Sequence, residues 1–388
     1  MASSHERAGP PQARIPERAA RGHSDDALRL GCTLRVAGHG QPSPGDELIR
    51  VGEWCRLHGH AADRYGDGDL IQSFEAKVAA LLGKPAAAFM VSGTMAQLIA
   101  LRIWCERVGT RRVAMHPTSH LELHEERAYA HLHDLQVTPM GARDRPNEAA
   151  DLAACPERLA ALLLELPARE IGGRLPVWKE LGEIAALARE RGVKLHMDGA
   201  RLWEAREAYA PRSFAEICAH FDSVYVSFYK GIGALAGAML LGPEDFIAEA
   251  RVWRRRHGGT LVQLHPLVAS AAMRFDEQLA KMPAYRNRAR EFAAAMATIE
   301  GIVIEPQPPE VNLFHIHFAV PVTALVAARD AIAAEHRAWL LPRVAAGRLP
   351  GWSTAEIYVG DNLLTLSDAV VVPLFAQLLQ RAREAAAA

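Results

Sequence analysis

The sequence has almost no net charge and no long hydrophobic run. The formal charge of its 388 residues is -1, and the pI is about 7.0. Such a chain has no long-range field that would attract nucleic acid or an anionic membrane. No apolar run approaches the roughly 18 to 20 residues that span a membrane. The triplet Arg254-Arg255-Arg256 could be read as a nucleic-acid patch, but arginines at a helix end more often complement the helix dipole or bind a phosphate. We therefore expect a small molecule as the partner, and neither nucleic acid nor a membrane.

Cysteines are few, odd in number and never spaced as a CxxC pair. The five are Cys32, Cys55, Cys105, Cys155 and Cys218. This pattern fits reduced thiols better than a disulfide framework or a structural zinc site, so we expect a cytoplasmic protein. The first 25 residues lack the apolar stretch of a secretory signal, and we expect a disordered leader there.

Lysine is also scarce, since six of the 44 lysines and arginines are lysines. One of the six, Lys230, stands between an apolar run and a glycine-rich turn, in Ser227-Phe228-Tyr229-Lys230-Gly231-Ile232-Gly233. An arginine cannot shed its proton, whereas a desolvated lysine can, and the free amine forms a Schiff base with a carbonyl. Taken alone, Lys230 is either a solvated loop lysine or such a nucleophile.

From about residue 69, short apolar runs alternate with segments of helical periodicity, as in βα units. Asp69 is expected to cap a helix that ends at Gly83, and Ser92 to open a second helix. Further strands are expected over 87–91, 112–115, 162–166, 193–197, 223–227 and 236–241, with helices over 176–191 and 244–256. This is an α/β pattern with a mostly parallel sheet, in which sites form at the carboxyl ends of strands.

After about residue 265 the pattern becomes α+β. A long helical stretch over 266–300 precedes strands over 301–304, 311–318 and 355–359, a helix over 322–336 and a last helix from Ser367. The expected organisation is therefore the leader over 1–25, an irregular arm rich in Gly, Pro and His over 26–60, a large domain over 61–265 and a smaller C-terminal domain over 266–388.

Three further features gain weight from their order along the chain. Asp198 follows the strand over 193–197, and a buried carboxylate there needs a cation such as a protonated pyridine nitrogen opposite it. Ser92-Gly93-Thr94 stands at a strand-to-helix junction, where it forms either a plain helix cap or a phosphate cup. Together with Lys230, these features indicate pyridoxal 5'-phosphate as the cofactor.

The chain resembles the threonine aldolase and β-eliminating lyase branch of the fold-type I pyridoxal-phosphate enzymes. The resemblance covers roughly residues 60 to 265, with a looser match beyond. It is carried by Arg64-Tyr65-Gly66-Asp67, Val91-Ser92-Gly93-Thr94-Met95-Ala96, Ser119-His120-Leu121 with Glu125, Gly172-Gly173-Arg174, His196-Met197-Asp198-Gly199-Ala200-Arg201-Leu202 and Tyr229-Lys230-Gly231-Ile232-Gly233-Ala234.

The resemblance implies a role for each site residue. Lys230 would form the Schiff base, and Asp198 would pair with the pyridine nitrogen. Ser92, Gly93 and Thr94 would hold the phosphate. His120 would stack on the cofactor ring and is a candidate base, while Arg201 would bind the substrate carboxylate with its planar fork. Ser227 is either a further phosphate ligand or a serine buried in its strand.

The chain departs from the family where substrate would bind. Ala168 stands where the family has its second active-site histidine, and Gly258 to Gln263 lack an arginine of the family's GGGMRQ segment. The N-terminal Asp-Thr-Val-Thr segment has no clear counterpart over 31–44, and the arm over 356–362 lacks the expected arginine. Glu125, Arg169 or a histidine from 39 to 60 could replace the missing base.

A metal site is a competing interpretation. His116, His120 and His124 are spaced four apart, and two such histidines with Glu125 would suit zinc or iron. However, Pro117 argues against a continuous helix through His116. The HxH pairs His58/His60, His131/His133 and His315/His317 often place such rings toward solvent. We expect no catalytic metal.

Three functions remain open at this point. The first is a carbon–carbon lyase that cleaves a β-hydroxy-α-amino acid to glycine and an aldehyde. The second keeps the cofactor but performs β-elimination, racemisation or transamination. The third is a non-catalytic homologue, against which the intact Lys230 and Asp198 argue. The resemblance also implies a homodimer or homotetramer, with contacts expected over 26–60 and 250–265.

Overall fold

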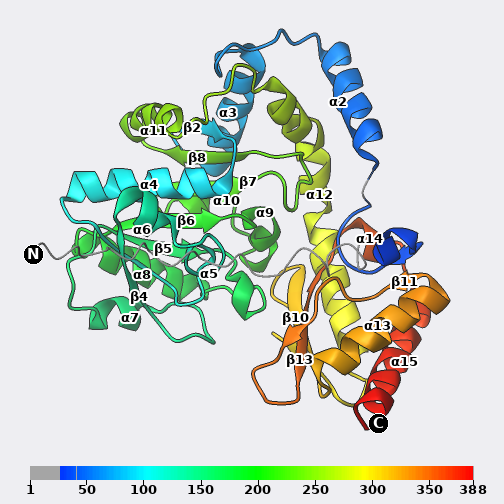
Figure 1. Cartoon of the computed structure of the whole chain (residues 1–388). Helices are drawn as coiled ribbons and strands as arrows, with labels where there is room; N and C mark the ends of the chain where they lie inside the picture. The colour runs from blue at the N-terminus through cyan, green and yellow to red at the C-terminus, as the bar shows by residue number, and fades with distance from the viewer. Residues whose placement is uncertain (1–26, 41, 388) are drawn as a thin grey trace, which may run out of the picture.

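The computed structural model describes residues 27–40 and 42–387, and the predicted leader over 1–25 lies outside them. Two larger sheets organise the chain, with the small sheet and the last helices grouped at one end of the molecule (Figure 1). The strands of the large sheet lie in the order β2 (Ala86–Met90), β8 (Ala238–Gly242), β7 (Ser223–Ser227), β6 (Lys194–Gly199), β5 (Ala161–Glu165), β3 (Arg112–Met115) and β4 (Gln136–Pro139). β8 runs antiparallel to both of its neighbours, and the remaining pairings are parallel.

Both faces of this sheet are buried. In β5, Leu162 and Leu164 pack into one hydrophobic core, whereas Leu163 packs into another. Because successive side chains of a strand point to opposite faces, a strand covered on both sides must be apolar throughout. The first core includes α3 (Asp69–Leu82), α8 (Trp178–Glu190) and α12 (His265–Met296), and the second includes α4 (Gly93–Val108) and α11 (Glu244–Arg256).

The smaller helices of this part lie in the connections between strands. They are α5 (His120–Leu123), α6 (Ala128–His133), α7 (Ala149–Ala154), α9 (Leu202–Ala205) and α10 (Phe214–Cys218), with 3-10 turns at Arg169–Ile171 and Arg206–Ala208. The strands and helices predicted up to residue 256 are confirmed to within two residues at their ends. One detail is wrong, because Asp69 is the first residue of α3 and Gly68 holds the cap position.

The long helix α12 leads from the large sheet to the small one (Figure 1). Its N-terminus is held by the buried carboxylate of Asp63, which accepts hydrogen bonds from the backbone N–H of Leu264 at 2.9 Å and of His265 at 2.8 Å. A carboxylate at this end satisfies unpaired N–H groups and complements the helix dipole. The two sheets are thereby joined through an anchored helix.

The small sheet is antiparallel. Its order is β12 (Ala345–Ala346), β13 (Ser353–Tyr358), β10 (Leu313–Phe318) and β9 (Ile302–Glu305). The helices beyond α12 are α13 (Val322–His336), α14 (Asp361–Leu364) and α15 (Asp368–Ala387). A short parallel pairing joins β1 (Leu34–Arg35) to β11 (Ala338–Trp339), so the N-terminal arm is tied to this end of the molecule. The predicted α/β fold with an additional α+β part is confirmed.

The prediction of an irregular arm over 26–60 is wrong in part. Residues Pro44–His58 form the helix α2, which extends along the edge of the molecule (Figure 1). Ser43 caps it, since its hydroxyl accepts a hydrogen bond from the N–H of Asp46 at 3.1 Å, and Gly59 ends it in a left-handed conformation. Proline is favourable in the first turn of a helix, so Pro44 is a start signal here and not a breaker.

The five cysteines are free thiols, as the sequence predicts. Among the helices of the described residues, none is both long and apolar enough to cross a membrane.

Candidate active site

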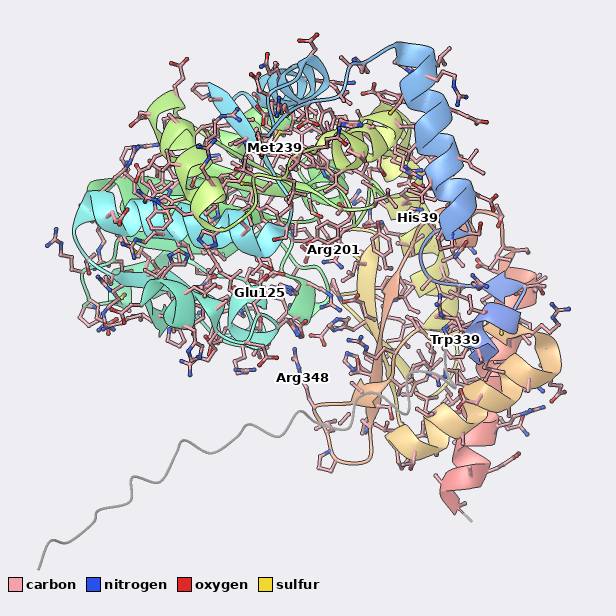
Figure 2. All side chains as sticks on the ribbon, turned by 45° about the horizontal axis from the view of Figure 1, so that its top comes forward. His39, Glu125, Arg201, Met239, Trp339 and Arg348 are labelled. Atoms are coloured by element: carbon pink, nitrogen blue, oxygen red, sulfur yellow. The ribbon has the colours of Figure 1, made fainter. Side chains whose placement is uncertain are left out.

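The predicted site residues meet where β6 and β7 end beside the N-terminus of α4. Asp198 lies on β6 opposite Tyr225 of β7, and Lys230 follows β7 by three residues. Lys230 and Arg201 both line a cavity of about 1240 Å³, whose other walls come from the N-terminal arm, helix α12 and the C-terminal part with the small sheet. In Figure 2, Glu125 and Arg201 are labelled beside the large sheet, and His39 near the start of α2. Residues far apart in sequence therefore share one site.

Lys230 has the electrostatic surroundings of a nucleophilic amine. Burial lowers its pKa, and the nearby charge of Arg201 lowers that pKa further, while Asp198 acts in the opposite direction. Burial outweighs the carboxylates because the charged ammonium loses its hydration. A depressed pKa increases the fraction of the free amine that a carbonyl requires.

Asp198 is a buried carboxylate held by two donors. The N–H of Ala200 donates to Oδ1 at 3.1 Å, and Nε2 of Gln97 donates to Oδ2 at 2.8 Å. Gln97 is a site residue that the sequence analysis missed. Its signal was a polar side chain in the otherwise apolar first turns of α4, four residues after Gly93.

The first turn of α4 is a candidate phosphate cup. Ser92 caps the helix, since its hydroxyl accepts a hydrogen bond from the N–H of Met95 at 3.3 Å. The first N–H groups of a helix have no partner within the helix and attract anions. A Cβ on Gly93 would lie 2.0 Å from Oη of Tyr225, so the chain requires glycine at this close approach.

Ser227 lies on β7 and is fully buried. Its backbone oxygen accepts a hydrogen bond from Nε1 of Trp203 at 2.8 Å. Its buried hydroxyl makes no hydrogen bond of regular geometry in the part of the chain that the structure describes, and the side chain of Tyr225 is the neighbour that interacts with it. A buried hydroxyl with so little hydrogen bonding fits a ligand atom beside it. This hydroxyl, the carboxylate of Asp198, the amine of Lys230 and the N-terminus of α4 together fit pyridoxal 5'-phosphate.

His120 stands at the start of α5, next to the ring of His124, with their ring centroids 4.9 Å apart. Nε2 of His120 lies 3.9 Å from Oε1 of Glu125. Burial, followed by the charge of Lys230, lowers the pKa of His120 to about 4. Burial also raises the pKa of Glu125 to about 7, although Thr94 donates a hydrogen bond to Oε1 at 2.8 Å. Between these two pKa values both groups are neutral, so their contact is not an ion pair.

Buried acids crowd around Lys230. Burial raises the pKa of Glu165, with the charge of Asp198 as the next cause, and burial likewise raises the pKa of Glu204. Oη of Tyr358 donates to Oε1 of Glu204 at 3.3 Å. A Cβ on Gly231 would lie 2.4 Å from the same oxygen, so a glycine must follow Lys230. Sequence reasoning missed both Glu204 and Tyr358.

Arg201 lines the same cavity as Lys230. Its Nε is buried and has no hydrogen-bond partner within residues 27–40 and 42–387. A guanidinium with an unused buried N–H is suited to a bidentate carboxylate ligand.

The position of the missing histidine is occupied differently. Ala168 is buried, and the next residue, Arg169, pairs its Nε with Oε2 of Glu356 at 2.7 Å. Glu356 lies on β13 and also lines the cavity. The small sheet therefore contributes a carboxylate to the site where the resemblance leads one to expect an arginine.

The histidines of the competing metal interpretation are engaged elsewhere. Nδ1 of His116 lies 2.7 Å from the hydroxyl of Thr118, and Nε2 of His124 lies 2.8 Å from Oε1 of Glu170. Among the described residues, no group of three or more His, Cys, Asp and Glu side chains could hold a metal ion.

A mostly parallel sheet with one antiparallel strand, an aspartate at the end of β6, a lysine after β7 and a helix N-terminus beside them define the class of fold-type I pyridoxal-phosphate proteins. Within this class, residues 56–320 match the family model for beta-eliminating lyases, and the chain belongs to that family.

Similar proteins agree with this placement. The chain is 32% identical over 226 residues to the low specificity L-threonine aldolase of Escherichia coli strain K12. This match covers 57% of this chain and 67% of that protein. It is 31% identical over 244 residues to the low-specificity L-threonine aldolase of Candida albicans, and here the match spans 58% of this chain but only 62% of the relative. A solved structure from Listeria monocytogenes, assigned as an L-allo-threonine aldolase, has a TM-score of 0.86 and 37% identity, covering 92% of this chain and 99% of the other. The predicted resemblance and fold class are confirmed, and the matches support the predicted class of threonine aldolase-like lyase.

Proposed function

We propose that the protein is a pyridoxal-phosphate-dependent aldehyde-lyase that cleaves the Cα–Cβ bond of a β-hydroxy-α-amino acid, giving glycine and an aldehyde. The observation that carries the proposal is the desolvated amine of Lys230, with its lowered pKa, on one cavity wall with Arg201. The names of the relatives favour this reaction over the other reactions of the cofactor.

The roles proposed for the residues are those that the family resemblance implies. Asp198 would hold the pyridine nitrogen of the cofactor, and Ser92, Gly93, Thr94 and Ser227 its phosphate. His120 would cover the ring. When bound, the cofactor supplies an electron sink for the bond that breaks at Cα.

Substrate binding falls to residues of the cavity. Arg201 would hold the α-carboxylate of the amino acid through two parallel hydrogen bonds. The amine of Lys230 would hold the cofactor between turnovers, and its depressed pKa lets it accept and return a proton near Cα. A retro-aldol reaction also needs a base that takes the β-hydroxyl proton. In the part of the chain around the large sheet, the candidates for this base are His120 and Glu125.

A second candidate function keeps the cofactor and changes the reaction to β-elimination, racemisation or transamination. Two observations favour it. Ala168 stands where the family has its second active-site histidine, and the ion pair of Arg169 with Glu356 adds a carboxylate to the cavity. A non-catalytic role is less well supported, since a binding module needs neither Lys230 nor Asp198.

Further expectations from the sequence belong to the same proposal. We propose a homodimer or homotetramer that acts on a small-molecule amino acid in the cytoplasm. The exposed apolar residues of α2 support an oligomer, and the free thiols support a reducing compartment.

The test compares Lys230→Ala with Lys179→Ala, since Lys179 lies exposed on α8. Purified wild-type protein and Lys179→Ala should bind pyridoxal 5'-phosphate and show the visible absorbance of a Schiff base between the cofactor and a lysine. Lys230→Ala should lack this absorbance. Incubation with a panel of β-hydroxy amino acids should yield glycine and aldehyde. A keto acid with ammonia would favour the second candidate, and a wild-type protein that stays colourless with added cofactor would refute both.

A further inference from the structure

We propose that His39, oriented by Asp361, is the base that takes the β-hydroxyl proton of the substrate. This inference rests on the proposed function and assigns a residue of the N-terminal arm to its site. His39 is half-buried just before α2 and lines the same cavity as Lys230 and Arg201.

The ring of His39 is held at one nitrogen and free at the other. Nδ1 lies 3.0 Å from Oδ2 of Asp361, whereas Nε2 is buried without a hydrogen-bond partner in the described chain. The backbone N–H of Asp361 also approaches Nδ1, at 3.3 Å. The contact of Nδ1 with the carboxylate is shorter and involves a charge. If Nδ1 carried no proton, its lone pair would point at a lone pair of Oδ2, and the two would repel each other. Nδ1 therefore carries the proton, and Nε2 presents the lone pair of a base.

Asp361 is itself fixed as an acceptor. Oη of Tyr285 donates to Oδ1 of Asp361 at 2.6 Å, and Nζ of Lys281 lies 3.4 Å from the same oxygen. These donors, together with His39, lower the pKa of Asp361 although its burial opposes them. The carboxylate thus stays ionised and keeps the imidazole in one tautomer, which is the arrangement of base and orienting group in nucleophilic sites.

His39 and Tyr358 line the same cavity as Lys230 and Arg201. The ring of His39 packs against that of Tyr358 with centroids 5.8 Å apart, and Oη of Tyr358 contacts Glu204, which lies against Gly231 beside Lys230. His39 and Tyr358 therefore lie side by side on the cavity wall that also includes Lys230. A substrate held by Arg201 at its carboxylate would extend its β-carbon into the cavity between these walls.

Other groups of the cavity are less suited to the task. Glu356 is paired with Arg169, and Glu204 accepts the hydrogen bond of Tyr358. Nε2 of His120 lies 3.9 Å from Oε1 of Glu125, and His120 is not among the residues that line this cavity. His39 combines a ring fixed by a carboxylate with an unused acceptor nitrogen, and it comes from an element unrelated to the missing histidine.

The proposed step balances without an added reactant. The β-hydroxyl proton moves to Nε2 of His39, and the O–H electron pair forms the new C=O bond as the Cα–Cβ bond breaks. The Cα–Cβ pair stays with Cα, which takes up a proton to give glycine. The imidazolium then returns its proton to water.

The experiment uses the cofactor-loaded full chain with His39→Gln, Asp361→Asn and the control His58→Gln, whose exposed histidine lies on α2 of the same arm. Wild type and control should cleave the preferred β-hydroxy amino acid equally. His39→Gln should lose roughly 100-fold or more in kcat, with KM nearly unchanged, since general-base catalysis contributes about 10² to 10⁴. Asp361→Asn should lose less, and added imidazole should partly restore His39→Ala.

Two further measurements separate catalysis from structure. Exchange of the α-hydrogens of glycine with solvent deuterium involves no β-hydroxyl, so it should proceed at the wild-type rate in His39→Gln, and the visible spectrum and thermal unfolding should match wild type. Full cleavage by His39→Gln, or equal loss of exchange and cleavage, would overturn the inference. If wild type makes keto acid and ammonia from every substrate, the proposed function itself fails and the inference falls with it.

Discussion

At the scale of single residues, the site contains three acids whose pKa is raised by burial. Glu125, Glu165 and Glu204 surround one lysine and one arginine, and burial is the first cause of the raised pKa of each. Burying carboxylates costs stability once they are charged, because their hydration is lost. The arrangement therefore lowers the free energy of unfolding near neutral pH, and it places groups that can give or take a proton beside the reacting amine.

This cost is measurable at Glu125. Its folded pKa of about 7 lies above the ordinary 4.5, so the folded protein binds the proton more tightly. The resulting stabilisation is complete below pH 4.5 and is lost as the pH rises through 7. Relative to Glu125→Gln, the cofactor-free wild type should therefore lose roughly 2 to 3 kcal/mol of unfolding free energy between pH 4.5 and 8.

Urea unfolding at several pH values checks this. Glu183→Gln, the same substitution on the exposed side of α8, serves as the control and should follow the wild-type curve. Parallel curves for wild type and Glu125→Gln would show that Glu125 is not the group that titrates.

At the scale of elements, the start of α4 depends both on a local helix cap and on a contact with a distant strand. Ser92 caps the helix, a choice that the sequence makes visible, whereas the glycine after it is required by the ring of Tyr225 on β7. Helix α2 illustrates the opposite case. Its glycines and Pro44 suggested an irregular arm, yet Ser43, Pro44 and Gly59 are helix start and stop signals when read together.

Gly93→Ala tests the close approach. The added Cβ would meet Oη of Tyr225 at 2.0 Å, so either the ring or the first turn of α4 must shift. We expect a loss of about 1 to 3 kcal/mol in unfolding free energy and at least roughly tenfold weaker binding of pyridoxal 5'-phosphate.

Gly182→Ala in α8 is the matched control, because the nearest atom to its added Cβ lies 3.8 Å away on His220. Alanine there should stabilise the helix by roughly 0.5 to 1 kcal/mol. Urea unfolding and spectral titration with the cofactor measure both variants, and unchanged cofactor affinity in Gly93→Ala would contradict the phosphate-cup role.

At the scale of the whole molecule, the cavity is assembled from the arm, the large sheet and the small sheet, which α12 joins. The arm also carries exposed apolar side chains, with Leu57 82% exposed and Leu48 and Ile49 more than half exposed on α2. Val252 and Val262 are at least half exposed, and they lie in the segment 250–265, where contacts between subunits are also expected. These exposed apolar side chains are the basis for the proposed contact between subunits.

Leu57→Lys should weaken that contact. Since burying a leucine contributes about 1.5 to 3 kcal/mol, the dissociation constant of the oligomer should rise at least roughly tenfold. Light scattering coupled to size exclusion, over a range of concentrations, measures the effect. Leu132→Lys, on α6 and 64% exposed, is the control. A wild-type monomer, or equal effects of the two variants, would contradict the role of α2.

The edge strand β4 was not predicted, but the sequence predicts the other six strands of the large sheet, its longer helices, the order of Ser92, Asp198 and Lys230 along it, and the cofactor that these imply. It could do so because burial patterns, caps and strand-end residues are local properties. Only the tertiary structure decided which groups share the cavity. Gln97 reaches Asp198, Arg169 pairs with Glu356, and His39 is turned by Asp361 across 322 residues of chain. Such contacts depend on packing between distant elements, and no local pattern encodes them.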